Sequence, residues 1–215
     1  MSRRSIVVID DFYEDPEEIR RHALSLEYHR GERVTYPGGE ARSPRDWSAA
    51  RTRLKAHVDE RVDAPCPKTP PFPQGLFRLA LAADEATRID GVHQDVQRWS
   101  GVVYLSRPED CEGGVAFMRH RETGLTASSR DFELSTFGHL AGRPQREIED
   151  EMLRYLADMR HWEEFQRIGM VYNRAVLLMG QCFHMSMGVF GADKQGGRLT
   201  QHFEFYTERD GQVLG

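Results

Sequence analysis

Several histidines in this 215-residue chain are followed two positions later by a carboxylate, and such pairs can bind a metal ion. Four of these pairs are candidates here: His57/Asp59, His93/Asp95, His161/Glu163 and His202/Glu204. Because both residue types are common, one such tripeptide has little value as a motif by itself. The choice among the pairs therefore depends on local geometry and on a third ligand.

Positions i and i+2 of a helix point about 200° apart, so a pair inside a helix cannot close on one ion. This excludes His57/Asp59, which falls in a helix predicted for residues 47–62. The pair at 161 and 163 directly follows another predicted helix and is interpreted as a cap or surface group. In a strand, i and i+2 share a face, so His93/Asp95 and His202/Glu204 both remain.

His184 favours the first of the two remaining pairs. It lies in the turn-like stretch 180–184, after the apolar strand AVLLM. Two histidines and one carboxylate form a facial triad that leaves three positions open on Fe(II) for a co-substrate and O2. His93 and Asp95, with His184 far downstream, have this order. No histidine follows His202, which could instead line the inner face, supporting the ligands or contacting substrate.

Arg198 stands fourteen positions after His184, at the head of the last predicted strand, RLTQHFEFY. An arginine there could form a bidentate ion pair with a carboxylate deep in a barrel. The alternative for a strand-end arginine is a side chain that faces solvent.

The elements that must position these residues fall into two regions. Residues 5–9 predict a buried strand, and Asp15-Pro16-Glu17-Glu18 predicts a helix start with Asp15 as N-cap. Residues 35–45 are rich in Gly, Pro and Ser and predict a loop, before the helix at 47–62. The five prolines of residues 64–74 then mark a break in regular structure.

From residue 76 onward the pattern changes to short strands that are rich in β-branched and aromatic residues. They are GLFRLALAA, VVYLS, GVAFMRH, IGMVYNRAVLLM and LTQHFEFY. Residues 144–160 interrupt them with apolar residues at helical spacing, which predicts an inserted helix that serves as a lid. The pattern predicts an α+β, mainly β, fold: a small sandwich or barrel braced by N-terminal helices.

The composition narrows the class of protein. The chain is 39% hydrophobic and 29% charged, with a net charge of −5, which argues against nucleic acid as a partner. No apolar run approaches 18 residues, and the N-terminal run at 6–9 is too short for a signal peptide. The three scattered cysteines fit a reducing cytoplasm. Exposed strands or the inserted helix could support a homodimer.

With these residues in place, the chain resembles the Fe(II)/2-oxoglutarate-dependent dioxygenases, especially their prolyl-4-hydroxylase-like branch. The resemblance covers residues 76–207, and five elements occur in the order of that branch. They are His93-Gln94-Asp95, Tyr104-Leu105-Ser106, Glu112-Gly113-Gly114 with Phe117, Asn173-Arg174 ahead of His184, and Arg198-Leu199-Thr200.

The resemblance implies one domain over residues 1–215, with 1–75 as support and 76–207 as a double-stranded β-helix, a jelly-roll or cupin-like barrel. His93, Asp95 and His184 would bind Fe(II). Arg198 and Tyr104 would hold the distal carboxylate of 2-oxoglutarate, the co-substrate used with O2. The implied reaction is hydroxylation or desaturation with release of succinate and CO2, because Asp95 occupies the place that a halide takes in related halogenases.

Two features depart from the branch. Ser106 replaces the commoner Asn, and the segment 118–168 with its helix is longer than the usual hairpin connection. The proline substrate is therefore not carried over, and a free amino acid, a peptidyl residue or a small natural product remains open. Two alternatives also stay open. One is a metal-dependent enzyme that does not use 2-oxoglutarate and in which Arg198 binds the substrate itself; the other is a barrel without catalytic activity that binds a small molecule or a partner protein.

Overall fold

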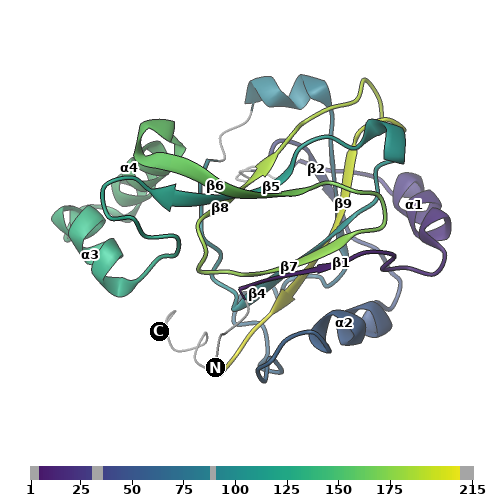
Figure 1. Ribbon diagram of the computed structural model, residues 1–215, viewed down its shortest axis with the longest axis horizontal. Coiled ribbons are helices and arrows are strands. Elements are labelled where there is room, and N and C mark those ends of the chain that lie inside the picture. The colour runs from purple at the N-terminus through teal and green to yellow at the C-terminus, as the bar shows by residue number, and fades with distance from the viewer. Residues whose placement is uncertain (1–4, 31–35, 88–90, 209–215) are drawn as a thin grey trace.

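Two antiparallel β-sheets make up the centre of the molecule in the computed structural model, which describes residues 5–30, 36–87 and 91–208 (Figure 1). The larger sheet has six strands in the order β1-β7-β4-β9-β3-β2, and the smaller has three in the order β6-β5-β8. The larger sheet consists of β1 (Ile6–Ile9), β2 (Gly39–Ala41), β3 (Leu76–Ala80), β4 (Trp99–Tyr104), β7 (Ala175–Met179) and β9 (Arg198–Phe205). The smaller consists of β5 (Gly114–His120), β6 (Trp162–Gly169) and β8 (His184–Met187).

The predicted strands at 5–9, 75–83, 114–120 and 199–206 are present, with shifts at their ends, although the strand at 5–9 is only partly buried. Two predictions about the connecting segments were wrong. The predicted loop at 35–45 contains β2, because Gly39–Ala41 pairs with β3. The predicted turn at 180–184 ends in β8, which starts at His184. The pair His161/Glu163 lies at the surface, as predicted, but it flanks Trp162, the first residue of a strand that was not predicted, β6.

Two N-terminal helices lie beside the larger sheet (Figure 1). The first, α1 (Pro16–Ser25), starts as predicted: the Asp15 side chain accepts a hydrogen bond from the Glu18 backbone N–H at 2.9 Å. This contact satisfies one of the four backbone donors that a helix leaves free at its start.

The second helix, α2 (Ser48–Lys55), is shorter than the predicted helix 47–62. The helix ends at Lys55, and further along the chain residues 63 and 64 form isolated bridges with Tyr206, just after β9. His57 therefore lies outside the helix, and helical geometry is not the reason to reject the pair His57/Asp59. Within the described ranges, neither residue belongs to a group of three that could hold a metal.

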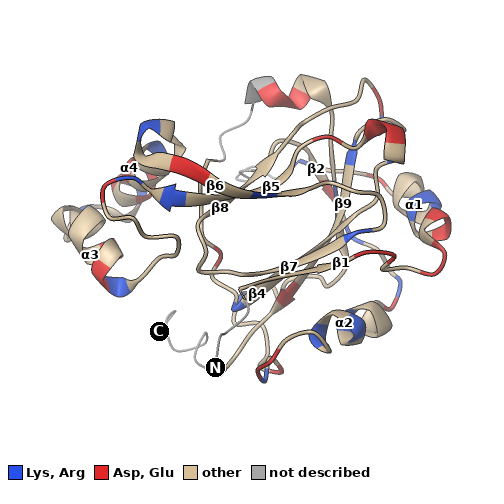
Figure 2. Cartoon of the chain, viewed as in Figure 1, with Lys and Arg blue, Asp and Glu red and all other residues tan. Residues whose placement is uncertain are grey.

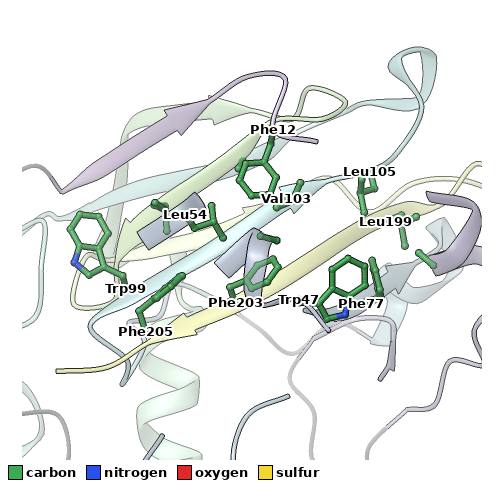
Figure 3. Packing of buried hydrophobic residues seen from close by; sticks show 14 of the residues in the cluster. Phe12, Trp47, Leu54, Phe77, Trp99, Val103, Leu105, Leu199, Phe203 and Phe205 are labelled. Atoms are coloured by element: carbon green, nitrogen blue, oxygen red, sulfur yellow. The ribbon is translucent and has the colours of Figure 1, made fainter. Parts of the chain in front are cut away.

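The main core lies between the larger sheet and these helices. Successive residues of a strand point to opposite faces, and one face of β9 consists of Leu199, Phe203 and Phe205 in this core. Figure 3 shows how they gather with side chains from the helices and neighbouring strands, including Phe12, Trp47, Leu54, Phe77, Trp99, Val103 and Leu105. The opposite face of β9 carries Arg198, Thr200, His202 and Glu204. This face lies toward the smaller sheet, since residues of both sheets line one cavity there.

Helices α3 (Arg130–Phe137) and α4 (Gln145–Ala157) lie between β5 and β6 in the chain. The predicted helix at 144–160 is confirmed as α4, while α3 was not predicted. A second core holds this region against the smaller sheet through Phe132, Trp162 and Phe183. Within it, His120 Nε2 lies 2.7 Å from the Tyr155 hydroxyl.

Short 3-10 helices complete the connections: η1 (Ala82–Thr87), η2 (Pro108–Asp110), η3 (Gly138–Leu140) and η4 (Met159–His161). Figure 2 shows charged residues of both signs on α1, α3 and α4, whereas the charged residues of α2 are all basic. Among the described helices, none combines the length and the apolar character that crossing a bilayer requires.

Candidate metal centre and its cavity

A backbone bridge brings the two distant parts of the candidate triad together. His93 and His184 form an isolated antiparallel pair, in which each backbone N–H donates to the other residue's carbonyl at 2.9 Å. The Asp95 N–H donates to the Gly180 carbonyl at 2.7 Å. A Cβ at position 180 would lie only 1.9 Å from the Gln97 carbonyl oxygen, so this close approach requires glycine.

The structure places His93, Asp95 and His184 so that one ligand atom from each lies within 4.8 Å of the others. The His184 Nε2 atom is 3.5 Å from Asp95 Oδ2, and the two imidazole centroids are 4.4 Å apart. Figure 1 places β8, which His184 begins, in the smaller sheet. These distances are of the size that a shared ion would require.

Each imidazole is oriented by a backbone carbonyl. Nδ1 of His93 lies 2.9 Å from the Gly91 oxygen, and Nδ1 of His184 lies 2.8 Å from the Cys182 oxygen. A carbonyl can only accept, so each Nδ1 carries the proton and each Nε2 keeps its lone pair. Metal-binding histidines commonly have this arrangement, in which the second ring nitrogen donates to the protein.

The third residue of the candidate cluster, Asp95, is held ionised. Burial acts to raise its pKa, but the neighbouring His184 and His93 and a hydrogen bond from the Ser100 hydroxyl together hold this pKa well below its usual range. The Ser100 oxygen in turn accepts a hydrogen bond from Gln97 Nε2 at 2.7 Å. At neutral pH the carboxylate therefore carries the negative charge that a divalent cation needs.

A cavity of about 360 Å³ opens beside this cluster and is lined by both sheets. Arg198 and Tyr104, the two residues that the family resemblance assigned to the co-substrate, lie on its walls and are 3% and 1% exposed. Arg198 is therefore not a solvent-facing strand end. Its Nη2 reaches the Gly114 carbonyl at 3.4 Å.

Two polar atoms of this pair are orphaned. Within the described part of the chain, neither Arg198 Nε nor the Tyr104 hydroxyl has a hydrogen-bond partner, although both are buried. Burial, partly offset by Arg198 and Arg174, raises the pKa of Tyr104 to about 12, so the phenol is a neutral donor beside a cation. A buried donor without a partner costs about 1–3 kcal/mol, and a carboxylate placed here would satisfy both. The pair thus fits the distal carboxylate of 2-oxoglutarate.

His202 also lines the cavity, with Nε2 2.9 Å from the Thr200 hydroxyl. The sequence interpretation allowed this inward position. Sequence reasoning missed Ser100 and Gln97, which support Asp95, and it missed Tyr36 and Arg78 on the cavity wall. The alternation of β3 could have indicated Arg78. Tyr36 lies beside a Pro-Gly-Gly turn, where no periodicity predicts the direction of a side chain.

Comparison with solved structures shows what the chain is similar to. A prolyl hydroxylase from Trichoplax adhaerens, in complex with a hypoxia inducible factor oxygen degradation domain peptide fragment, superposes with a TM-score of 0.52 at 9% identity. The match covers 98% of this chain and 87% of that one, and it shows a shared fold.

Two further structures have lower scores. HygX from Streptomyces hygroscopicus, with nickel and 2-oxoglutarate bound, has a TM-score of 0.47 at 14% identity and covers 95% of this chain and 83% of its own. The Fe(II)/(alpha)ketoglutarate-dependent dioxygenase TqaL has a TM-score of 0.41 at 10% identity and covers 94% and 82%. The sequence has no significant match among curated proteins. Residues 1–205 match the model of a family of unknown function (DUF6445), and the chain belongs to that family.

Proposed function

We propose that this protein is an Fe(II)- and 2-oxoglutarate-dependent oxygenase that acts on a C–H bond of a small molecule, an amino acid or a peptidyl residue. One observation carries the proposal: a His-Asp-His cluster shares a cavity with a buried guanidinium and phenol that have unsatisfied donors. The cluster suits Fe(II) with open coordination positions, and the orphaned donors suit a carboxylate.

The sheet order supports the proposal. We assign the fold to the double-stranded β-helix, with β3-β9-β4-β7 as one wall and β8-β5-β6 as the other. The His93–His184 bridge continues the second wall by one more strand position. In this assignment residues 1–75 support a barrel over residues 76–207, and the helices between β5 and β6 are an insertion.

Each residue would have a physical task. Asp95 and the two imidazoles would hold Fe(II), with their orientation fixed by Ser100 and by two backbone carbonyls. Arg198 and Tyr104 would bind the distal carboxylate of 2-oxoglutarate and orient the molecule toward the ion. When bound, Fe(II), 2-oxoglutarate and O2 supply the oxidising chemistry, which yields an oxidised substrate, succinate and CO2.

The test is spectroscopic. Purified protein receives Fe(II) and 2-oxoglutarate without oxygen, and the visible charge-transfer band of the complex is recorded. We expect Asp95→Ala to lose the ion. Arg198→Ala should keep the ion but weaken 2-oxoglutarate binding by about 30-fold or more, the result of losing a buried charge contact worth about 2–5 kcal/mol.

The control is Arg167→Ala, which removes an exposed arginine of β6 that pairs with Glu164. It should leave the band unchanged. If iron binds to the wild-type protein and no band forms, the protein is a metal enzyme that does not use 2-oxoglutarate in this way. If no iron binds, the metal assignment is wrong.

A further inference from the structure

The cavity contains a second arginine and tyrosine that the proposed function does not use. The Arg78 guanidinium carbon lies 5.1 Å from the centre of the Tyr36 ring, and both residues line the same cavity as the metal cluster. Arg78 Nε donates to Glu40 Oε1 at 2.8 Å, across the β2–β3 pair. The Tyr36 hydroxyl is buried, and the described residues offer it no hydrogen-bond partner.

This second pair is separate from Arg198 and Tyr104. On β9, Arg198 is opposite Ala80 of β3, while Arg78 is opposite Thr200. His202 lies near both arginines. Its burial, and then the positive charges of Arg78 and Arg198, lower the pKa of His202 well below the usual value. His202 is therefore neutral at physiological pH and does not compete for an anion.

The acidic groups of the cavity are already occupied. Glu204 accepts from Lys68 Nζ with both oxygens, at 2.7 and 2.8 Å, and from the Tyr206 hydroxyl. Asp95 belongs to the metal cluster. Two other groups line the cavity: Arg78, whose guanidinium is bound to Glu40 on one side, and Tyr36, whose buried hydroxyl lacks a hydrogen-bond acceptor among the described residues.

We propose that Arg78 and Tyr36 form a substrate subsite that binds the free carboxylate of a small organic acid. The inference rests on the proposed function, since it names the substrate class of the same cavity. The Arg78 guanidinium and the Tyr36 hydroxyl can both donate hydrogen bonds to a carboxylate. A monoanion fits better than a phosphate dianion because Glu40 already balances part of the charge of Arg78. The cavity of about 360 Å³ must also hold 2-oxoglutarate, which limits the substrate to a small molecule.

The experiment uses the full chain with Fe(II) and 2-oxoglutarate. The twenty common L-amino acids and their carboxamides are compared in pairs by succinate release in air. The best acid and its amide are then titrated calorimetrically into the complex without oxygen, which gives a Kd that does not depend on turnover. We expect at least one acid to stimulate succinate release and to bind at least about tenfold more tightly than its amide.

Two variants assign the preference to these residues. Arg78→Gln should raise the Kd of the acid by about tenfold or more and leave the Kd of the amide within about twofold. Tyr36→Phe keeps the ring under Arg78 and removes only the hydroxyl, so it should raise the Kd of the acid by about three- to tenfold. Both variants should keep the charge-transfer band with Fe(II) and 2-oxoglutarate. Arg167→Gln on exposed β6 is the matched control and should change neither Kd.

The outcomes separate the two proposals. If the wild-type protein gives no charge-transfer band, the proposed function is overturned and this subsite with it. If the band forms but no acid stimulates succinate release, or acid and amide bind equally well, only the subsite is overturned. The same holds if both variants bind the acid as the wild-type protein does.

Discussion

Gly180→Ala is expected to separate the two halves of the candidate metal cluster. Gly180 follows β7, and its carbonyl oxygen accepts a hydrogen bond from the Asp95 N–H. The backbone carbonyl oxygens of Asp95 and Gln97 lie where a Cβ at position 180 would point. A methyl group there would lie 1.9 Å from the Gln97 carbonyl oxygen, whereas ordinary contact begins at 3.4 Å. The segment that carries Asp95 must therefore move by about 1.5 Å relative to the turn that leads to His184.

The size of the effect follows from this displacement. Metal–ligand distances tolerate only about 0.2 Å, so a shift several times larger removes Asp95 from its place beside the two imidazoles. Losing an outer partner of a ligand already weakens metal binding by about 10–100-fold, or roughly 1.4–2.7 kcal/mol, and we take this as the minimum. Crowding in a packed interior costs a further ~1–3 kcal/mol of stability, which lowers Tm by roughly 2–12 °C.

The assay is an anaerobic titration with Fe(II), combined with a thermal melt of the metal-free protein. Circular dichroism establishes that the variant is folded. The control is Gly169→Ala at the end of β6, where an added Cβ meets no atom within 4 Å. A folded Gly180→Ala protein that binds Fe(II) as tightly as the control would refute the claim that this close approach positions the ligands.

Two smaller predictions follow from the contacts around the sheets. Ser100→Ala removes the hydroxyl that donates to Asp95, so Fe(II) affinity should fall by about 10–100-fold in the same titration; an unchanged affinity would show that the hydroxyl does not support the ligand. His120 is buried in the second core, and burial lowers its pKa, so the unfolded chain binds a proton at a higher pH than the folded one. The stabilisation from neutral His120 is complete above the unfolded pKa of about 6.5 and is lost as the pH falls below it. Tm should therefore fall more between about pH 8 and about pH 5.5 in the wild-type protein than in His120→Gln, and equal falls would contradict the assignment.

Sequence patterns predicted the parts of this molecule whose geometry is local. The Asp15 cap depends on four consecutive residues, and the alternation of β9 depends only on the period of a strand. In the structure Arg198 and His202 lie on one face of β9 and Phe203 on the other, as this period requires, whereas the sequence analysis had left open whether Arg198 faces inward or toward solvent. The order of the candidate ligands along the chain could also be predicted, because it depends only on which residue stands at each position.

The elements that sequence reasoning missed depend on pairing with distant partners. The short β2 exists because Glu40 lies opposite Arg78 of β3, in a stretch whose own composition favours a loop. In β6, the exposed Glu163, Glu164 and Arg167 remove the apolar alternation that would have indicated a strand. Asp63 and Ala64, beyond the end of α2, likewise form bridges with the distant Tyr206. None of these partners can be inferred from a local window.

The bridge between His93 and His184 illustrates the same limit at the site itself. The sequence argument assumed that His93 and Asp95 share a face of a strand, but only His93 is paired, and Asp95 is positioned by its N–H bond to Gly180. The convergence of the cluster therefore depends on a turn after β7, not on strand geometry alone. This turn is possible because Gly180 has no Cβ, so the Gln97 carbonyl oxygen can approach its backbone closely. The geometry of the candidate cluster depends on that close approach. For this reason the position to examine first in any variant that loses metal is Gly180, although it contributes no ligand.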